Sequence, residues 1–208
     1  MNPAPDMNPA PHMNRELRER AARIKLLLLD VDGVLTDGRL FFGNNGEEFK
    51  SFSTLDGQGI KTLQKSGVKV GIITGRTSNL VARRASDLGI TILVQGREDK
   101  WDALQEILQQ HPAELDEIAF MGDDWPDLTV MTRVGLAFTV ANAHPSVASR
   151  AHWQSRERGG EGAVRAACDL IMQAQGTFDA ALASYLATNL DTHLDTHLDT
   201  HLDTNSEA

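Results

Sequence analysis

Two carboxylates separated by one residue directly follow the apolar run Leu26 to Leu29. Four leucines ahead of Asp30 and Asp32 are typical of a buried parallel strand that ends at the ligand-binding edge of an α/β sheet. On an extended backbone, side chains two residues apart point to the same side. Carboxylates held that close repel each other unless a cation lies between them or one is protonated. The pair therefore predicts metal-assisted chemistry.

Further polar clusters follow three other apolar runs. They are Thr74, Gly75 and Arg76; Lys100, at the start of an expected helix; and Asp123 and Asp124, with Asp127 three residues later. The carboxyl ends of parallel strands share one edge of a sheet, so residues scattered along the sequence converge there.

Each cluster has a task in the transfer of a phosphoryl group. Asp30 can attack phosphorus once a divalent cation screens its charge, giving an acyl phosphate. Asp32 is placed to protonate the leaving alcohol and later to deprotonate the hydrolytic water. Thr74 can bind phosphoryl oxygens, and Lys100 offsets the charge of both phosphate and carboxylates. With Asp123 as a further carboxylate, the set of oxygen ligands suits Mg²⁺.

Each cluster also has an ordinary structural explanation. An Asp-x-Asp pair is common in exposed loops, Thr-Gly-Arg is typical of a turn, and a lysine at a helix start is usually solvated. Asp123 and Asp124 could simply cap the helix that follows. The joint placement of the clusters, each after an apolar strand, favours the catalytic interpretation.

Composition limits the kinds of partner. The 208 residues are 41% hydrophobic, enough for one domain, and the formal net charge of −9 argues against nucleic acid as a partner. The sequence has neither a membrane-spanning apolar run nor the pattern of a signal peptide, so we expect a cytoplasmic protein that does not bind membranes. Cys168 is the sole cysteine, which excludes an internal disulfide, and its helical surroundings favour a core role over a nucleophilic one.

Strand and helix signals alternate, which predicts an α/β fold with a doubly wound parallel sheet. The expected strands are 26–31, 68–74, 91–94, 118–121 and 135–138. The expected helices are 59–65, 77–88, 99–110, 127–133 and 161–173. Between the first strand and the first helix, 39–53 is typical of a β-hairpin that turns at Gly43-Asn44-Asn45-Gly46.

Both ends of the chain are repetitive. The segment 1–5 recurs at 7–11, and Leu-Asp-Thr recurs four times after residue 189. Such repeats cannot build a core alone, so we expect a low-complexity extension over 1–20, a domain over 21–176 and a disordered tail over 177–208. On a helix, His193, His197 and His201 would align as metal ligands, but a frayed tail is the favoured interpretation.

Taken together, the motifs resemble those of the haloacid dehalogenase superfamily of phosphatases, over about residues 25–174. The resemblance implies a Rossmann-like domain that binds Mg²⁺. It also implies that Asp30 is the nucleophile and that Asp32 is the general acid and base, with its carbonyl on the metal. Asp123 would be the remaining metal carboxylate.

Four more segments resemble the capless sugar-acid phosphatases of this superfamily that act on 3-deoxy-D-manno-octulosonate 8-phosphate, in lipopolysaccharide synthesis. The segments are 43–48, 56–61, 140–145 and 159–165. The resemblance implies a homotetramer in which a neighbouring subunit closes each active site, with only the hairpin in place of a cap domain. It assigns substrate or phosphate contacts to Ser53, Thr54, Leu55, Asp56, Gly57, Lys61, Thr74, Gly75, Arg76, Arg84, Lys100 and Asp124, and a supporting role to Asp127.

Two departures from that pattern leave the substrate open. Leu55 stands where a basic residue is expected, and Glu161 stands where the glycine-rich segment often has arginine. Arg158 and Arg165 are candidates to compensate for the lost charge. The alternatives are a phosphatase of a nine-carbon, sialic-acid-type sugar phosphate and a non-catalytic scaffold of the same fold; the intact set of charged motif residues argues against the scaffold.

Overall fold

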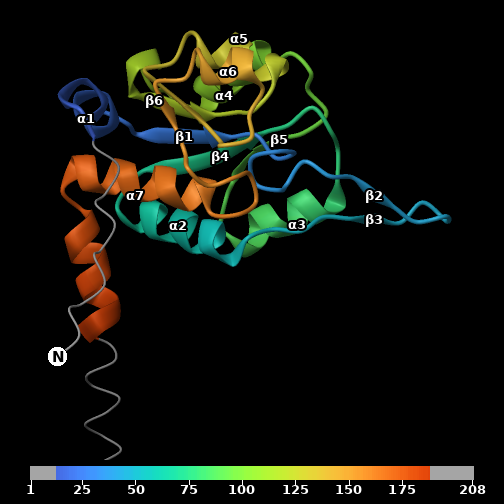
Figure 1. Ribbon diagram of the computed structural model, residues 1–208, viewed down its shortest axis with the longest axis horizontal. Coiled ribbons are helices and arrows are strands. Elements are labelled where there is room, and N and C mark those ends of the chain that lie inside the picture. The colour runs from blue at the N-terminus through green and yellow to red at the C-terminus, as the bar shows by residue number, and fades with distance from the viewer. Residues whose placement is uncertain (1–12, 188–208) are drawn as a thin grey trace, which may run out of the picture.

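A six-stranded parallel sheet forms the centre of the protein (Figure 1). The computed structural model describes residues 13–187, so the predictions for the two terminal repeats, including the three tail histidines, lie largely outside the described residues. In the order β5-β4-β1-β6-β7-β8, the strands are Ile92–Val94, Lys69–Ile73, Leu26–Leu29, Ile118–Met121, Leu136–Thr139 and Trp153–Gln154. After β5 the chain crosses to the other side of β1, which confirms the predicted doubly wound sheet.

Helices cover both faces of this sheet (Figure 1). One face packs against α1 (Arg15–Ala22), α2 (Thr54–Lys65), α3 (Asn79–Asp87) and α7 (Ala163–Gln175). The other packs against α4 (Lys100–Gln110), α5 (Leu128–Met131) and α6 (Pro145–Ala148). Alternate leucines of β1 belong to the two cores, Leu27 and Leu29 to the first and Leu26 and Leu28 to the second. Burial on both sides explains the continuous apolar run.

The predicted elements are present, but several begin or end at other residues. The helix expected from Gly59 begins at Thr54, because the Ser53 side chain accepts a hydrogen bond from the backbone of Asp56 and caps it. Two glycines in its first turns weakened the helical signal. The short elements α6 and β8 were not predicted, since four and two residues show no periodicity.

Helical structure continues past residues 21 and 176, the bounds predicted for the domain. Helix α1 lies within the segment expected to be low-complexity, and its Leu17 and Ala21 are buried in the core beside α7. At the other end, 178–187 is helical, and Phe178 packs against the same core. In both segments, apolar residues at helical spacing pack against the core. The repeats beside these segments obscured that spacing in the sequence.

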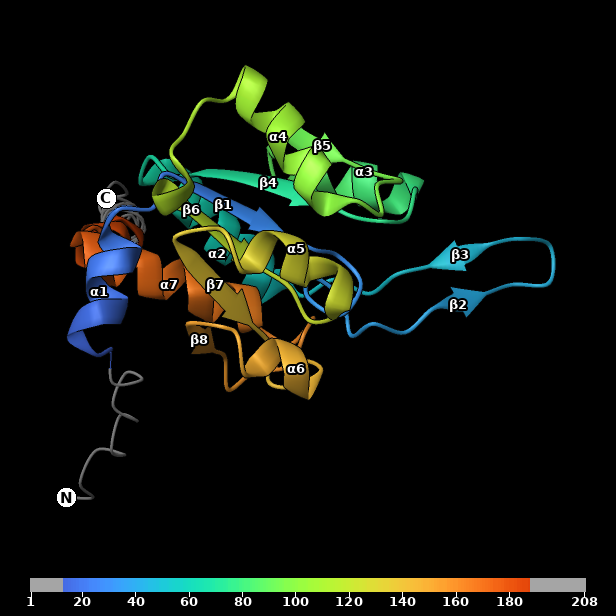
Figure 2. The same ribbon diagram turned by 90° about the horizontal axis from the view of Figure 1, so that it is seen from above.

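The predicted hairpin is confirmed, as β2 (Phe41–Phe42) paired with β3 (Glu48–Phe49). Figure 2 shows it projecting away from the body, beyond the end of the sheet toward which the β1 and β4 arrows point. Three of its phenylalanines are at least half exposed, Phe41 at 50%, Phe42 at 64% and Phe49 at 63%. The hairpin is thus the only insert between β1 and α2, and it leaves the sheet edge open.

Candidate active site

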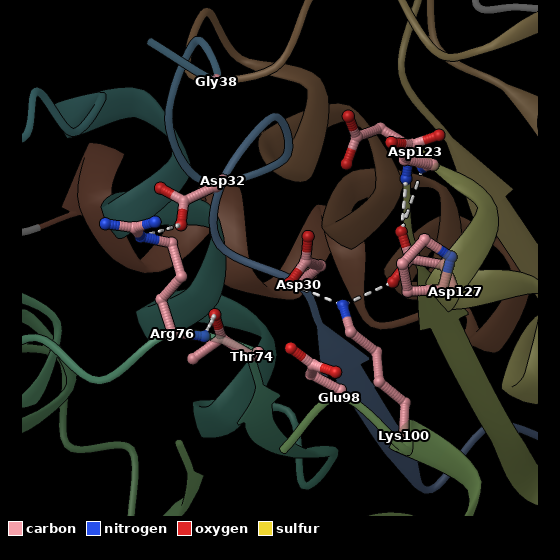
Figure 3. Close-up of a pocket in the computed structure, with 12 residues that line it drawn as sticks. Asp30, Asp32, Gly38, Thr74, Arg76, Glu98, Lys100, Asp123 and Asp127 are labelled. Carbon is pink, nitrogen blue, oxygen red and sulfur yellow. Dashed lines mark hydrogen bonds and ion pairs between the residues drawn. The ribbon is translucent and has the colours of Figure 1, made fainter. Parts of the chain in front are cut away.

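The predicted polar clusters meet in one cavity of about 460 Å³ at the carboxyl edge of the sheet (Figure 3). It is lined by Asp30, Asp32, Gly38, Thr74, Gly75, Arg76, Glu98, Lys100, Asp123, Asp124, Pro126 and Asp127. These residues follow β1, β4, β5 and β6, as expected for a doubly wound sheet.

Asp30 and Asp32 lie on a tight loop after β1. The backbone N–H of Asp30 donates to the carbonyl of Met121 on β6, so the residue stays in register with the sheet and is only 8% exposed. The loop then turns at Gly33, whose φ of 102° is left-handed. A Cβ atom at this position would overlap the carboxylate of Asp123. Glycine therefore allows the loops after β1 and β6 to touch.

Lys100 joins two of the carboxylates. Asp99 caps the start of α4 by accepting from the backbone N–H groups of Trp101 and Asp102, which places Lys100 in the first turn. Its ammonium lies 2.7 Å from Asp30 Oδ1 and 2.5 Å from Asp127 Oδ1. The lysine is 4% exposed, so water screens these ion pairs very little.

Asp127 is occupied on both oxygens. Oδ1 accepts from Lys100, and Oδ2 accepts from the backbone N–H groups of Asp123 and Asp124 at 2.9 and 3.1 Å. This carboxylate is 1% exposed and holds the loop after β6 in place. Asp127 thus connects Lys100 to the loop after β6.

Burial and mutual repulsion shift the protonation of this cluster. Burial, followed by the charge of Asp127, raises the pKa of Asp30 to about 6. Burial, followed by the charges of Asp127 and Asp30, raises the pKa of Asp123 to about 8. Burial alone disfavours the charged form of Lys100, but the coulombic attraction of Asp30 and Asp127 outweighs it and raises the pKa of the ammonium. The cluster therefore holds more negative charge than the Lys100 ammonium can neutralise.

The carboxylates fit a hard divalent cation. One oxygen from each of Asp30, Asp123 and Asp127 lies within 4.8 Å of the others. Oδ1 of Asp123 is buried without any hydrogen-bond partner, which is costly unless a cation binds it. Because both oxygens of Asp127 are already engaged, Asp30 and Asp123 are the carboxylates available to a metal ion.

Thr74 and Arg76 form the opposite wall of the cavity. Thr74 is buried after β4, and its hydroxyl accepts from the backbone N–H of Arg76 at 3.4 Å. Arg76 is half exposed, with Nε 3.9 Å from Asp32 Oδ2 and the guanidinium 5.9 Å from the ring centre of Phe42 on the hairpin. The wall presents positive charge and polar backbone groups to a ligand.

The cavity also contains residues that the sequence reasoning missed. Gly38, Glu98 and Pro126 line it, and Lys50 of the hairpin, which is not part of the lining, forms an ion pair with the lining residue Asp32. Glu98 and Pro126 each lie within two residues of a motif member, so sequence proximity was an available signal. Lys50 had no such signal in the sequence, because only the folded hairpin brings it to the loop after β1.

The predicted substrate segment at the start of α2 does not line the cavity within one chain. It comprises Ser53, Thr54, Leu55, Asp56 and Gly57, together with Lys61 and Arg84. Arg84 instead donates to the backbone carbonyl of Ser53 at 3.0 Å. The Asp56 carboxylate is 1% exposed and accepts from the backbone N–H of Arg165 at the start of α7.

The two arginines considered as compensating charges also lie outside the cavity. The Nε of Arg165 pairs with Asp169, one turn along α7, at 2.8 Å. Arg158 and Glu161 are exposed on the loop before α7. Leu55 is 57% exposed, so its side chain is open to solvent in the single chain.

Cys168 confirms the prediction of a core role. It is a free, fully buried thiol in α7, and burial raises its pKa, so the reactive thiolate is disfavoured.

Within residues 13–187, no helix is long and apolar enough to cross a membrane.

Comparison with known proteins points to one family. Residues 92–166 match the model of the haloacid dehalogenase-like hydrolases. The 3-deoxy-D-manno-octulosonate 8-phosphate phosphatase KdsC of Yersinia pestis is 48% identical over 163 residues, which cover 78% of this chain and 87% of that protein.

Solved structures agree with this match. A probable YrbI family phosphatase from Pseudomonas syringae has 51% identity and a TM-score of 0.82, covering 83% of this chain and 98% of its own. The 3-deoxy-D-manno-octulosonate 8-phosphate phosphatase of Moraxella catarrhalis, solved with magnesium, phosphate and KDO, has 40% identity and a TM-score of 0.81, covering 84% and 99%. The chain therefore belongs to the haloacid dehalogenase-like hydrolases and, within them, to the family of 3-deoxy-D-manno-octulosonate 8-phosphate phosphatases.

Proposed function

We propose that this protein is a Mg²⁺-dependent phosphatase that hydrolyses 3-deoxy-D-manno-octulosonate 8-phosphate, a step in lipopolysaccharide sugar synthesis. The supporting observation is the buried Asp30 carboxylate. It forms an ion pair with Lys100 and lies within 4.8 Å of Asp123, whose Oδ1 is buried without a hydrogen-bond partner. A nucleophile, a fixed cation and a metal ligand thus share one cavity. The name of the Yersinia relative and the ligands of the Moraxella structure support the same assignment.

The charge balance of the cavity supports a divalent cation as cofactor. Six carboxylates line it, against the two cationic side chains of Arg76 and Lys100, so a phosphate dianion would be repelled without further positive charge. Asp30 and Asp123 would hold Mg²⁺, and the family resemblance adds the backbone carbonyl of Asp32. When bound, the ion screens the nucleophile from the phosphate and stabilises charge on the phosphoryl oxygens.

In the first step, Asp30 attacks phosphorus. An Asp30 oxygen forms a bond to phosphorus while the bond from phosphorus to the sugar oxygen breaks, and the electron pair of that bond stays on the sugar oxygen. Asp32 gives its proton to this oxygen, so the sugar leaves as a neutral alcohol. Thr74, Gly75 and Arg76 bind the phosphoryl oxygens, and Lys100 keeps Asp30 ionised and oriented.

In the second step, water releases the phosphate. Asp32, now a carboxylate, takes a proton from a water molecule while the oxygen of that water attacks phosphorus. The bond between Asp30 and phosphorus breaks, and its electron pair returns to the Asp30 carboxylate. The products are the free sugar acid, inorganic phosphate and the original enzyme.

The open cavity supports a homotetramer in which a neighbouring subunit completes the site. The hairpin exposes an apolar cross-strand pair, Phe41 opposite Phe49, far from the core of its own chain. We propose that it packs against another copy and that a neighbouring chain supplies walls that the missing cap domain would provide. The buried, unpaired Cys168 agrees with a reducing compartment such as the cytoplasm.

Phosphate release from a panel of sugar phosphates tests this function. With Mg²⁺, we expect selective hydrolysis of 3-deoxy-D-manno-octulosonate 8-phosphate, and EDTA should abolish it. Leu55 and Glu161 keep open the alternative of a nine-carbon sialic-acid-type phosphate. Preference for that compound would change the proposed substrate but not the proposed mechanism. Absence of any turnover with Mg²⁺ bound would favour a scaffold instead.

A further inference from the structure

Lys50 is a buried lysine that reaches from the hairpin to the loop after β1. Its side chain is 1% exposed, and its ammonium forms an ion pair with Oδ1 of Asp32. The same ammonium lies 3.5 Å from the Glu48 carboxylate on β3. Removing an ammonium from water is costly unless a partner compensates it, so the pairing fixes where this side chain lies.

The two oxygens of Asp32 consequently differ. Oδ1 is held by Lys50, whereas Oδ2 is 3.9 Å from Nε of Arg76, beyond hydrogen-bond distance. Figure 3 shows Asp32 and Arg76 side by side at the cavity, with the carboxylate across from Asp30. Oδ2 is thus the oxygen of Asp32 that remains available to a substrate or a water molecule.

We infer that Lys50 is a positioning residue that fixes Asp32 by its Oδ1, so that Oδ2 is the atom that moves the proton. In the first step the Oδ2–H bond breaks, the proton joins the sugar oxygen, and the electron pair stays on Asp32. In the second step Oδ2 takes a proton from water. This inference rests on the proposed function, and it gives the hairpin a part in the chemistry.

The orienting role follows from the exposure of Asp32. Its side chain is 20% exposed, and its two cationic neighbours differ: the Lys50 side chain is buried, whereas Arg76 is 46% exposed and lies 3.9 Å away, so Lys50 is the partner that can hold the carboxylate in place. Without Lys50 the Asp32 carboxylate could turn freely about its χ2 torsion, which has no sharp staggered minima, and proton transfer depends on an oxygen held within hydrogen-bond reach. A lysine anchored on the hairpin removes that freedom.

Replacing Lys50 by Met tests the inference with two substrates that differ in leaving group. A sugar alkoxide needs a proton to leave, whereas p-nitrophenolate does not. For K50M we expect kcat/KM, which covers steps up to phosphoryl transfer, to fall about 100-fold for the sugar phosphate and less than about fivefold for p-nitrophenyl phosphate. The kcat should fall for both, because water activation also needs Asp32.

Two controls separate orientation from a structural role. Arg39→Met removes an exposed cation from the same hairpin and should leave both activities within about twofold. Combining K50M with Asp32→Asn should cost no more than Asp32→Asn alone, since Lys50 acts through Asp32. Thermal unfolding of each variant verifies the fold.

Other outcomes would overturn the inference. Equal loss of kcat/KM on both substrates would mean that Lys50 supports the cavity as a whole, and no loss would mean that it is dispensable. Additive losses in the double variant would also contradict it. A wild-type protein that hydrolyses only p-nitrophenyl phosphate would instead disprove the proposed substrate, and the fall in kcat of K50M on that compound would still decide the role of Lys50.

Discussion

Asp30 combines burial with a fixed cationic partner, and this combination suits a nucleophile. Burial raises its pKa to about 6, so it is mostly ionised at neutral pH, and the Lys100 ammonium 2.7 Å away directs one of its oxygens. The other oxygen is left for phosphorus or a metal ion.

Replacing Asp30 by Asn keeps the shape but removes the nucleophile. We expect kcat for the sugar phosphate to fall by about 10⁴-fold or more, with the fold intact by circular dichroism. Asp102→Asn, an exposed carboxylate on α4, serves as the matched control and should retain full activity. Activity of D30N above a tenth of the wild-type value would contradict a covalent mechanism.

Asp123 makes the stability of the metal-free protein depend on pH. In the unfolded chain it ionises near its usual pKa of 3.8, whereas in the fold its pKa is about 8. Between these values the unfolded state loses its proton while the native state keeps it, so the free energy of unfolding falls as the pH rises. Asp30, with a pKa of about 6, adds to the same slope.

Thermal unfolding in EDTA should therefore show a midpoint that decreases from about pH 5 to about pH 8. Mg²⁺ should restore the midpoint most strongly at the upper end, where it binds the ionised carboxylates. Asp123→Asn should flatten the decrease, because it removes the larger contribution. An identical slope in this variant would show that other groups cause the pH dependence.

At the scale of elements, Asp56 connects α2 to α7. Helix α7 follows Gly162, which has no side chain to cap it, and the Asp56 carboxylate takes this place by accepting from the backbone N–H of Arg165. Burial raises the pKa of Asp56, and hydrogen bonds from the start of α7 partly offset that shift. A residue assigned to substrate binding by resemblance thus has a structural contact of its own.

Asp56→Ala should lower the free energy of unfolding by about 1–2 kcal/mol, the usual cost of a lost helix cap. Urea denaturation measures this change. Asp87→Ala, at an exposed aspartate on α3, should change stability by less than about 0.5 kcal/mol. Equal effects of the two substitutions would show that the contact with α7 contributes nothing.

The accuracy of the predicted elements follows from how local their signals are. The apolar run Ile118–Met121 predicted both ends of β6 correctly. Gly89, with its φ of 71°, lies two residues after the last residue of α3, close to the predicted end of that helix. The start of α2 depended on Ser53, a cap that the glycines after it concealed. Strand β8 exists because Trp153 pairs with Phe138 of β7, a contact that no local pattern predicts.

For the whole molecule, the apolar surface of the hairpin is the basis of the proposed assembly. Phe41 and Phe49 lie opposite each other and are 50% and 63% exposed, and hydrophobic surface of this kind is typical of an interface. Phe42 contacts Arg76 at the cavity, so it is unsuitable for separating assembly from activity.

Replacing Phe41 and Phe49 together by Ser should dissociate the proposed tetramer and lower activity with it. Burial of a phenylalanine contributes about 1.5–3 kcal/mol, so the loss of two per subunit weakens association strongly. Sedimentation velocity measures the assembly, and Leu115→Ser, at an exposed leucine before β6, should leave it unchanged. A wild-type monomer, or a tetrameric double variant, would contradict the proposal.

The sequence by itself determined the nature of the chemistry. Carboxylates and a threonine directly after apolar strands, and a lysine at the start of the helix that follows another strand, converge at one edge of a parallel sheet, because its strands all end there. The tertiary structure alone decided how these groups are used. Burial and distance set the raised pKa of Asp123, Lys50 reaches Asp32 only through the folded hairpin, and Asp56 contacts α7 rather than the cavity. Such effects depend on what surrounds each side chain in space, which no local pattern records.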